Sequence, residues 1–335
     1  MPPDAAEIFR EQARGITRVN LTAVTVTAQL ARILDGAGID WITFKGLALA
    51  AQVYGLLGVK ASNDIDILVP QDATGEVCAL LIAAGYTRFN PGREVRDDQL
   101  AAWIRISKEI GWKHPGTGLI VELHGRVMAN PSLFPEANIA APRKRIQVAQ
   151  GLEVPTMGDS LLFPYLVAHG AHSGWFRLKW LADVAALLAR DPEGIERQYR
   201  EAEALGVGRC AAQALLLAQD LLALPLAPDF AAELRARRVH RRLVGIAMRS
   251  MAGAFEAREH GAAVTRSLLP VVFGNLLLRR GLGYKWHELA SLAANPVDRS
   301  TGRLSAALGF LYPVLGGIRW SARVFGRAGK RQGAA

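Results

Sequence analysis

Strand-forming sequence patterns stop at about residue 158 of this 335-residue chain. Before that point, short apolar strands are mixed with helices in an order that does not repeat as strict β-α-β units. Beyond it, segments rich in Ala, Leu and Arg show helical periodicity, namely 159–190, 196–224, 229–260, 265–281 and 284–294. The change predicts an α+β fold, in which a small mixed sheet with flanking helices precedes an all-helical C-terminal region.

The chain is long enough for two modest domains. We place their boundary near Val154-Pro155, after the basic residues Arg143-Lys144-Arg145. Residues 1–154 are predicted to form the α/β core, and residues 155–295 a helical domain that closes a cleft. Residues 296–335 are predicted to form a basic amphipathic tail.

Apolar periodicity and turn signals predict the elements of the core. Residues 103–128 are typical of a hairpin around the turn at 114–118, and Arg143-Lys144-Arg145 is interpreted as a basic loop. The other expected elements are a helix at 5–36, a strand at 41–44, a helix at 47–54, a loop at 55–63, a strand at 64–69 and a helix at 72–84.

The basic charge of the chain lies in its C-terminal third. Residues 1–234 hold 22 Lys and Arg against 26 Asp and Glu, whereas residues 235–335 hold 18 against 4. Such asymmetry indicates a nucleic acid, a membrane surface or another anionic partner, or else a solvated set of Arg-rich helices. The uncharged stretch 304–318 is shorter than the roughly 20 residues that a membrane-spanning helix needs.

Cysteine usage and the N-terminus bear on the compartment. Cys78 and Cys210 cannot make a disulfide framework and lack metal-ligand spacing. The first residues show no basic region followed by an apolar one, as a secretory signal would. We therefore expect a cytoplasmic protein, with a peripheral position at the inner membrane surface as the alternative.

The most informative motif is Asn63-Asp64-Ile65-Asp66-Ile67-Leu68-Val69. In a strand, side chains alternate between faces, so Asp64 and Asp66 are expected to point the same way. Two carboxylates on one face of an apolar strand repel each other, and a divalent cation resolves that conflict. Mg²⁺, or Mn²⁺, suits these hard oxygen ligands and also takes substrate phosphates.

A third carboxylate is offered by Ile120-Val121-Glu122-Leu123-His124, where alternation puts Glu122 and His124 on one face. If this strand neighbours the Asp strand, Glu122 can complete a metal cluster or accept a proton from an attacking hydroxyl. His124 can assist there or hydrogen-bond a carboxylate that binds the metal.

Phe44-Lys45-Gly46 stands at a predicted strand-to-helix turn. Gly46 lets the backbone approach a ligand closely, and the positive end of the following helix suits a phosphate group. Lys45 adds a direct charge. Neither a P-loop nor a G-x-G-x-x-G dinucleotide motif is present in the chain.

Together these residues resemble the nucleotidyltransferase superfamily that includes DNA polymerase beta, and more closely its bacterial "uncharacterised nucleotidyltransferase" family. The likeness covers roughly residues 40–190 and continues weakly to about 260. The matching features are Lys45-Gly46, Tyr54, Lys60, the Asp64–Val69 strand, Gly85-Tyr86, Val121-Glu122-Leu123-His124, His169, His172, Arg177-Leu178, Trp180-Leu181 and Asp183.

The resemblance implies a nucleotidyltransferase-type sheet and metal-dependent transfer of a nucleoside monophosphate from an NTP to a hydroxyl acceptor. It implies that Asp64, Asp66 and Glu122 are the catalytic residues and the metal ligands. The acceptor stays open between a small molecule, a peptide or protein side chain and an RNA end.

The same resemblance assigns the phosphate contacts. Lys45 and Gly46 would contact the triphosphate, Lys60 is the basic residue that precedes the D-x-D strand, and His124 completes the nucleotide-binding set.

Two alternatives remain at this point. A D-x-D motif also holds the metal of nucleotide-sugar-dependent glycosyltransferases, although only 63 residues precede it here. The same fold can also act as a non-catalytic binder of nucleotide or nucleic acid that uses the basic C-terminal helices.

Overall fold

The computed structural model describes residues 3–55, 58–252 and 269–293. Its packing divides these residues into two compact units. The sheet unit comprises the described parts of 1–129 and 137–159, and the helical unit comprises 130–136 and the described residues from 160 onward. The chain has the predicted α+β architecture, with a mixed sheet, flanking helices and a helical C-terminal region.

A five-stranded sheet with the order β1-β2-β5-β4-β3 is the centre of the sheet unit. The neighbours β2 and β5 run parallel, and the other neighbouring pairs run antiparallel. The strands are β1 (Ile42–Thr43), β2 (Asp64–Leu68), β3 (Thr87–Asn90), β4 (Glu109–Lys113) and β5 (Ile120–His124).

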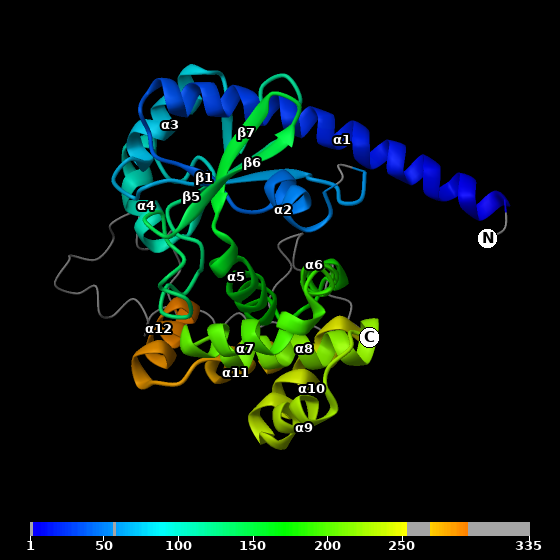
Figure 1. Ribbon diagram of the computed structural model, residues 1–335. Coiled ribbons are helices and arrows are strands. Elements are labelled where there is room, and N and C mark those ends of the chain that lie inside the picture. The colour runs from blue at the N-terminus through cyan, green and yellow to red at the C-terminus, as the bar shows by residue number, and fades with distance from the viewer. Residues whose placement is uncertain (1–2, 56–57, 253–268, 294–335) are drawn as a thin grey trace, which may run out of the picture. The chain divides into compact units, whose positions relative to one another are not determined.

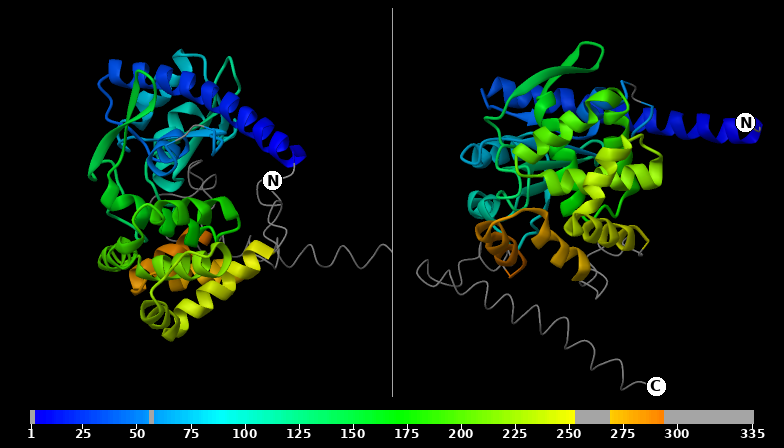
Figure 2. Two further views of the ribbon diagram at one scale, coloured as in Figure 1. Left: turned by 45° about the vertical axis from the view of Figure 1, so that its right-hand side comes forward. Right: turned by 60° about the horizontal axis from the view of Figure 1, so that its bottom comes forward.

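Four helices and a separate ribbon surround that sheet (Figure 1). Helix α1 is a single long helix, drawn in blue in Figures 1 and 2, and it contacts both α2 and β2. These elements are α1 (Pro3–Gly36), α2 (Gly46–Val53), α3 (Thr74–Ala83), α4 (Leu100–Ile106) and the ribbon β6 (Arg143–Ala149) with β7 (Leu152–Met157).

The core of the sheet unit consists of apolar side chains from the two parallel strands and their neighbours. Ile65 and Ile67 of β2 and Val121 and Leu123 of β5 are buried, as the alternating pattern predicts. Phe44, at the turn into α2, is buried beside them. This packing fixes the polar residues that alternate with these apolar ones on the opposite face of the same strands. They form the site described below.

The helical unit is built around α8, whose face toward the other helices is almost wholly buried. Helix α8 contacts α6, α7, α9 and α10. The described helices of this unit are α5 (Asp159–His172), α6 (Leu178–Leu188), α7 (Ile195–Ala204), α8 (Gly208–Leu222), α9 (Pro228–Ala236), α10 (Arg238–Ala252), α11 (Leu269–Leu278) and α12 (Leu282–Ala293). Closure of a cleft by this unit stays a prediction.

Residues 104–106 are not part of the hairpin, so the sequence-based prediction was wrong at this point. They end helix α4, because Leu100, Trp103 and Ile104 are buried at the helical spacing i, i+3, i+4. The hairpin proper is β4 and β5 around the turn at 114–118, as predicted there.

Arg143-Lys144-Arg145 is also a correction, because these residues begin strand β6 rather than form a loop. Their long side chains extend along an exposed ribbon and make ion pairs with acidic residues. Arg143 pairs with Asp40, and Lys144 pairs with Asp159. The ion pairs allow basic residues to form a strand.

The predicted helix 159–190 is two helices, α5 and α6. Between them Gly174 and Trp175 both have positive φ angles, of 66° and 55°. The Trp175 ring is fully buried and lies against Gly170, where a Cβ atom would be 2.3 Å from it. Burial of this ring compensates for a backbone conformation that only glycine adopts readily.

The predictions for the basic C-terminal segment 296–335 and for the apolar stretch 304–318 lie outside the described residues. Among the helices that the structure does describe, none combines the length and apolarity needed to cross a membrane.

Candidate metal and nucleotide site

The polar site starts from the pairing of β2 with β5. Their parallel register sets Asp66 opposite Glu122 and Leu68 opposite His124. The Glu122 strand is thus a neighbour of the Asp strand, which was the condition for Glu122 to join the site. Because paired residues in adjacent strands point to the same face, Asp66 and Glu122 lie side by side, with His124 two residues further along.

Asp66 is the most deeply buried carboxylate of the site, with 1% of its surface exposed. Its Oδ1 atom accepts hydrogen bonds from Lys45 Nζ at 2.7 Å and from His124 Nε2 at 2.9 Å. Burial on its own would raise the pKa of Asp66, but the Lys45 ammonium and the His124 hydrogen bond outweigh it and hold this pKa well below its usual range. Asp66 is therefore ionised near neutral pH.

The second oxygen of Asp66 is different. Oδ2 is buried and has no hydrogen-bond partner among the described residues. A buried carboxylate oxygen without a partner is costly, since it has lost its water and gained nothing in return. A cation bound at this oxygen would remove that cost.

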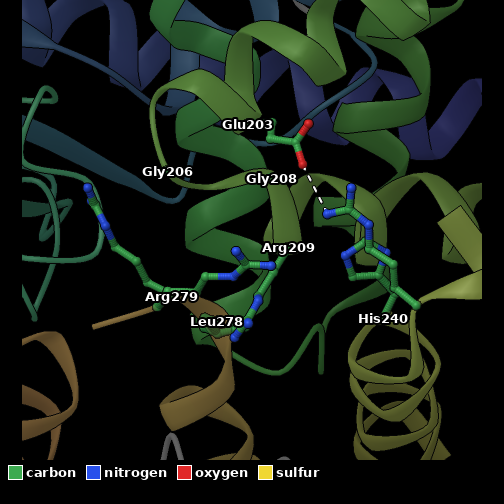
Figure 3. Close-up of a pocket in the computed structure, with 9 residues that line it drawn as sticks. Glu203, Gly206, Gly208, Arg209, His240, Leu278 and Arg279 are labelled. Atoms are coloured by element: carbon green, nitrogen blue, oxygen red, sulfur yellow. Dashed lines mark hydrogen bonds and ion pairs between the residues drawn. The ribbon is translucent and has the colours of Figure 1, made fainter. Parts of the chain in front are cut away.

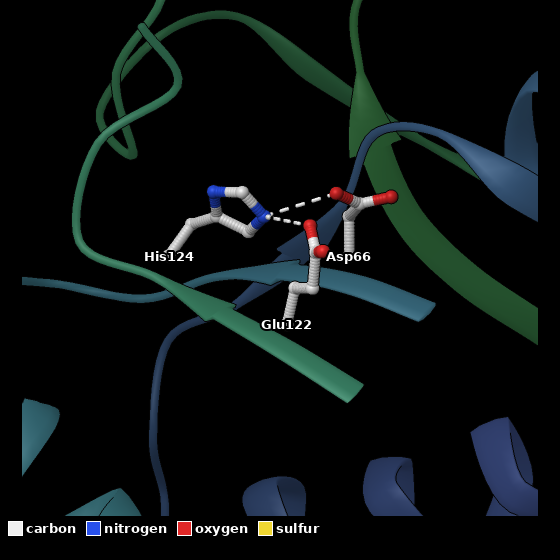
Figure 4. Close-up of side chains that lie close together, drawn as sticks. All are labelled: Asp66, Glu122 and His124. Carbon is white, nitrogen blue, oxygen red and sulfur yellow. Dashed lines mark hydrogen bonds and ion pairs between the residues drawn. The ribbon is translucent and has the colours of Figure 1, made fainter. Parts of the chain in front are cut away.

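Glu122 and His124 complete a compact cluster with Asp66 (Figure 4). Glu122 Oε2 lies 3.4 Å from His124 Nε2. One ligand atom from each of the three side chains falls within 4.8 Å of the others. Figure 4 shows the three side chains converging from two adjacent strands. Two carboxylates and one imidazole at this spacing form a candidate site for a divalent cation.

Two further side chains, those of Glu109 and Phe44, lie beside the imidazole of His124. Glu109 lies opposite His124 in the β4–β5 register, and its Oε2 atom is 3.7 Å from His124 Nδ1. Phe44 packs edge-on against the ring, with 5.1 Å between the centroids. Burial tends to raise the pKa of Glu109, but the charges of Lys108 and His124 lower it overall.

Sequence reasoning missed Glu109, although the signal was there. The turn at 114–118 sets Lys113 opposite Ile120. Counting away from the turn along each strand then sets Glu109 opposite His124. The 3.7 Å separation is too long for a hydrogen bond, and His124 Nδ1 has no hydrogen-bond partner among the described residues. Glu109 thus adds a negative charge beside the imidazole.

Lys45 and Gly46 stand where α2 begins. Lys45 is the residue before the helix, and its ammonium is directed to Asp66. Gly46 has a φ angle of +50°, and a Cβ atom here would lie 3.3 Å from the Asp64 carbonyl oxygen and 3.4 Å from Ser62 Oγ. Glycine is therefore required for close packing of this turn on β2.

We expect Gly46→Ala to lower the free energy of unfolding by about 1–2 kcal/mol, because alanine is strained at this φ and crowds the Asp64 carbonyl. Urea denaturation measures the change. Gly75→Ala in α3 is the matched control, since nothing lies within 4 Å of its Cβ position and it should be neutral or stabilising. Equal effects of the two substitutions would contradict this account of Gly46.

Asp64 and Lys60 are the two other predicted site residues near the start of β2. Asp64 is exposed at the start of β2, and its carboxylate lies outside the group formed by Asp66, Glu122 and His124. Lys60 lies in the loop before β2, where its carbonyl accepts a hydrogen bond from Asn20 of α1. The roles expected for these two side chains in metal and phosphate binding stay predictions.

Two carboxylates and a histidine on adjacent parallel strands, beside a lysine at a helix start, form a candidate site for a divalent cation on an α+β fold. The family described as "uncharacterised nucleotidyltransferase" matches residues 1–223. The chain belongs to this family of nucleotidyltransferases, and the match begins earlier than the resemblance at about residue 40 indicated. No curated protein matches the chain.

Proposed function

We propose that the protein transfers a nucleoside monophosphate from an NTP to a hydroxyl acceptor and releases pyrophosphate. The observation that carries the proposal is the convergence of Asp66, Glu122 and His124 on one face of the sheet, in a chain of a nucleotidyltransferase family. We further propose that the reaction requires Mg²⁺ or Mn²⁺.

The residues present fit such a cation. The unpartnered Asp66 Oδ2 atom, the Glu122 carboxylate and the His124 imidazole are the donors within reach of one another, and Asp64 is an exposed carboxylate on the same strand. Mn²⁺ accepts both oxygen and imidazole ligands, whereas Mg²⁺ favours the oxygens. When bound, the cation neutralises the negative charge that develops on the phosphates during transfer.

The chain's own residues supply the remaining chemistry. The acceptor oxygen forms a bond to the α-phosphorus, and the bond from that phosphorus to the bridging oxygen of pyrophosphate breaks. Glu122, which is partly exposed, is the base that takes the proton of the acceptor hydroxyl. Lys45 and Lys60 are the cations that offset the charge of the departing pyrophosphate.

Lys45 has two roles in this proposal. In the structure its ammonium neutralises Asp66. Because lysine carries its charge on a flexible stem, the same group can turn to a phosphate once a divalent cation has taken over Asp66. The lysine thus keeps the acidic cluster stable until metal and nucleotide bind.

The test is a donor comparison with the full chain. Each of the four NTPs, labelled at the α-phosphate, is incubated with Mg²⁺ or Mn²⁺ and pools of small alcohols, peptides and RNA, and the label is followed into the acceptor. We expect metal-dependent transfer from at least one NTP, and an upward thermal shift with NTP and metal together. Glu76→Gln in α3, an exposed glutamate that is not a member of the cluster, should behave as wild type.

Two outcomes would overturn the proposal. Transfer from a nucleotide-sugar but from no NTP would favour a glycosyltransferase. Nucleotide binding that is unchanged by Asp64→Asn and Asp66→Asn, with no transfer by any of the three proteins, would favour a non-catalytic binder.

A further inference from the structure

A second polar pocket lies in the helical unit and shares no residue with the cluster on the sheet (Figure 3). Its volume is about 410 Å³, within the range of pockets that hold small molecules. It is formed where the α7–α8 turn meets α10 and the end of α11. The lining residues are Glu203, Gly206, Gly208, Arg209, Arg237, His240, Leu278, Arg279 and Arg280.

The charge of this lining is strongly unbalanced. The lining contains four arginines and one carboxylate, that of Glu203. Glu203 also pairs with Arg200, which does not line the pocket. Arg237 binds Glu203 at 3.1 Å. Arg280 has no ion pair among the described residues, so positive charge remains in excess.

The positive charges of these arginines also repel one another. Burial lowers the pKa of Arg209, and the neighbouring charges of Arg280 and Arg237 lower it further. Burial likewise lowers the pKa of His240, and Arg237 and Arg209 add to that effect despite the hydrogen bond to Leu234. Like charges gathered in a partly buried pocket are costly unless an anion joins them.

The fold holds this cluster in place. Arg209 donates to the Leu277 carbonyl at 2.7 Å, and Arg279 donates to the carbonyls of Ser132 and Leu133 at 3.0 and 2.8 Å. Gly206 has a φ angle of +82°, and a Cβ atom there would lie 2.8 Å from the Arg279 guanidinium. The pocket therefore has anchored walls, and α8 begins within it at Gly208 with its positive end.

We propose that this pocket binds an oligophosphate, meaning two or more adjacent phosphate groups on one small molecule. Guanidinium groups match phosphate oxygens in geometry and stay charged, and several of them around one cavity suit several phosphates rather than one. A free inorganic oligophosphate and the phosphate chain of a nucleotide share this chemistry.

A small ligand fits the pocket better than an RNA strand does. Proteins that bind single-stranded nucleic acid combine basic grooves with aromatic side chains on which the bases stack. Among the described residues that line this pocket there is no Phe, Tyr or Trp. The basic charge of the C-terminal third is thus partly explained by a pocket, since Arg237, Arg279 and Arg280 belong to it.

The test is calorimetric titration of the full chain in EDTA, which removes divalent metal from the acidic cluster. The probes are inorganic triphosphate, ATP and a short single-stranded RNA. We expect saturable binding of triphosphate at one site. Arg237→Gln/Arg280→Gln should weaken it at least about tenfold, because two charged contacts are lost.

Arg238→Gln is the matched control, since Arg238 follows Arg237 in the chain, is exposed at the start of α10 and does not line the pocket. The affinity of the Arg238→Gln variant for triphosphate should stay within about twofold of that of the wild type. If the double variant unfolds, Arg280→Gln alone replaces it, because this exposed side chain has no ion pair to lose among the described residues.

The arms of the experiment separate the outcomes. Tighter binding of ATP than of triphosphate identifies a nucleotide as the source of the phosphates, and equal binding identifies the phosphates alone. Absence of saturable triphosphate binding, or equal weakening by Arg238→Gln, would overturn the proposal. RNA binding that needs Arg237 and Arg280, with no triphosphate binding, would overturn it in favour of RNA.

Discussion

Replacing Asp66 with asparagine is expected to lower metal-dependent transfer from NTP by about 10³-fold, which corresponds to about 4 kcal/mol of transition-state stabilisation. Asparagine keeps the size of the side chain while removing its charge. Asp66 is the buried member of the cluster and carries the unpartnered Oδ2 atom, so its loss removes the strongest of the proposed cation ligands. Initial rates at saturating metal and NTP measure the effect.

Asp229→Asn is the control for this substitution, because Asp229 is exposed on α9 in the helical unit. It should change the rate by less than about twofold, as surface substitutions usually do. Circular dichroism and a thermal midpoint establish that Asp66→Asn still folds. Activity of Asp66→Asn within tenfold of wild type would contradict the role given to Asp66.

Replacing Lys45 with methionine is expected to destabilise the protein by about 3 kcal/mol in the absence of metal, because Asp66 then becomes a buried charge without its ammonium partner. The two atoms of this pair are 2.7 Å apart. Addition of Mg²⁺ or Mn²⁺ should restore most of the loss, since metal at 100 times its dissociation constant stabilises by about 2.7 kcal/mol. Urea denaturation with and without metal measures both effects.

The same substitution separates stability from catalysis. With the ammonium gone, the divalent cation no longer competes with it for Asp66, so Lys45→Met should bind metal more tightly while transferring nucleotide more slowly. Lys285→Met on α12 is the control and should show neither effect. Destabilisation by Lys45→Met that metal leaves unchanged would contradict the proposal that the Asp66 cluster is the metal site.

Alternation along strands predicted from the sequence alone which polar side chains of each strand share a face. Apolar residues at every second position placed Asp66 on one strand and Glu122 and His124 on another, and β2 and β5 are indeed neighbours. The turn at 114–118 was likewise recognisable from its glycines and proline, and it joins β4 to β5 as expected. These features depend on residues that are close together in the chain, so they could be predicted from the sequence.

Contacts between distant residues could not be predicted in this way. The sequence indicated that a metal neutralises the aspartates, yet in the structure the Lys45 ammonium already neutralises Asp66, and His124 hydrogen-bonds it. Lys45 precedes Asp66 by 21 positions, and only the packing of α2 against β2 brings its ammonium to the carboxylate. The choice between strand and helix at Ile104, and between strand and loop at Arg143, was also decided by tertiary contacts.

The role of Asp64 is not a matter of local pattern either. Alternation sets it on the face of Asp66, but it stands at the exposed first position of β2, outside the cluster. The role in metal binding that the D-x-D motif and the family resemblance indicated for Asp64 therefore stays a prediction.

The central claim is that Asp66 and Glu122 bind the divalent cation that supports nucleotidyl transfer. A crystal structure with Mn²⁺ and a non-hydrolysable NTP analogue, with manganese located by anomalous scattering, tests it directly. We predict a manganese peak about 2.2 Å from a carboxylate oxygen of each residue, bridged to the phosphates of the analogue. Manganese and nucleotide bound elsewhere, with the Lys45–Asp66 ion pair intact, would contradict it.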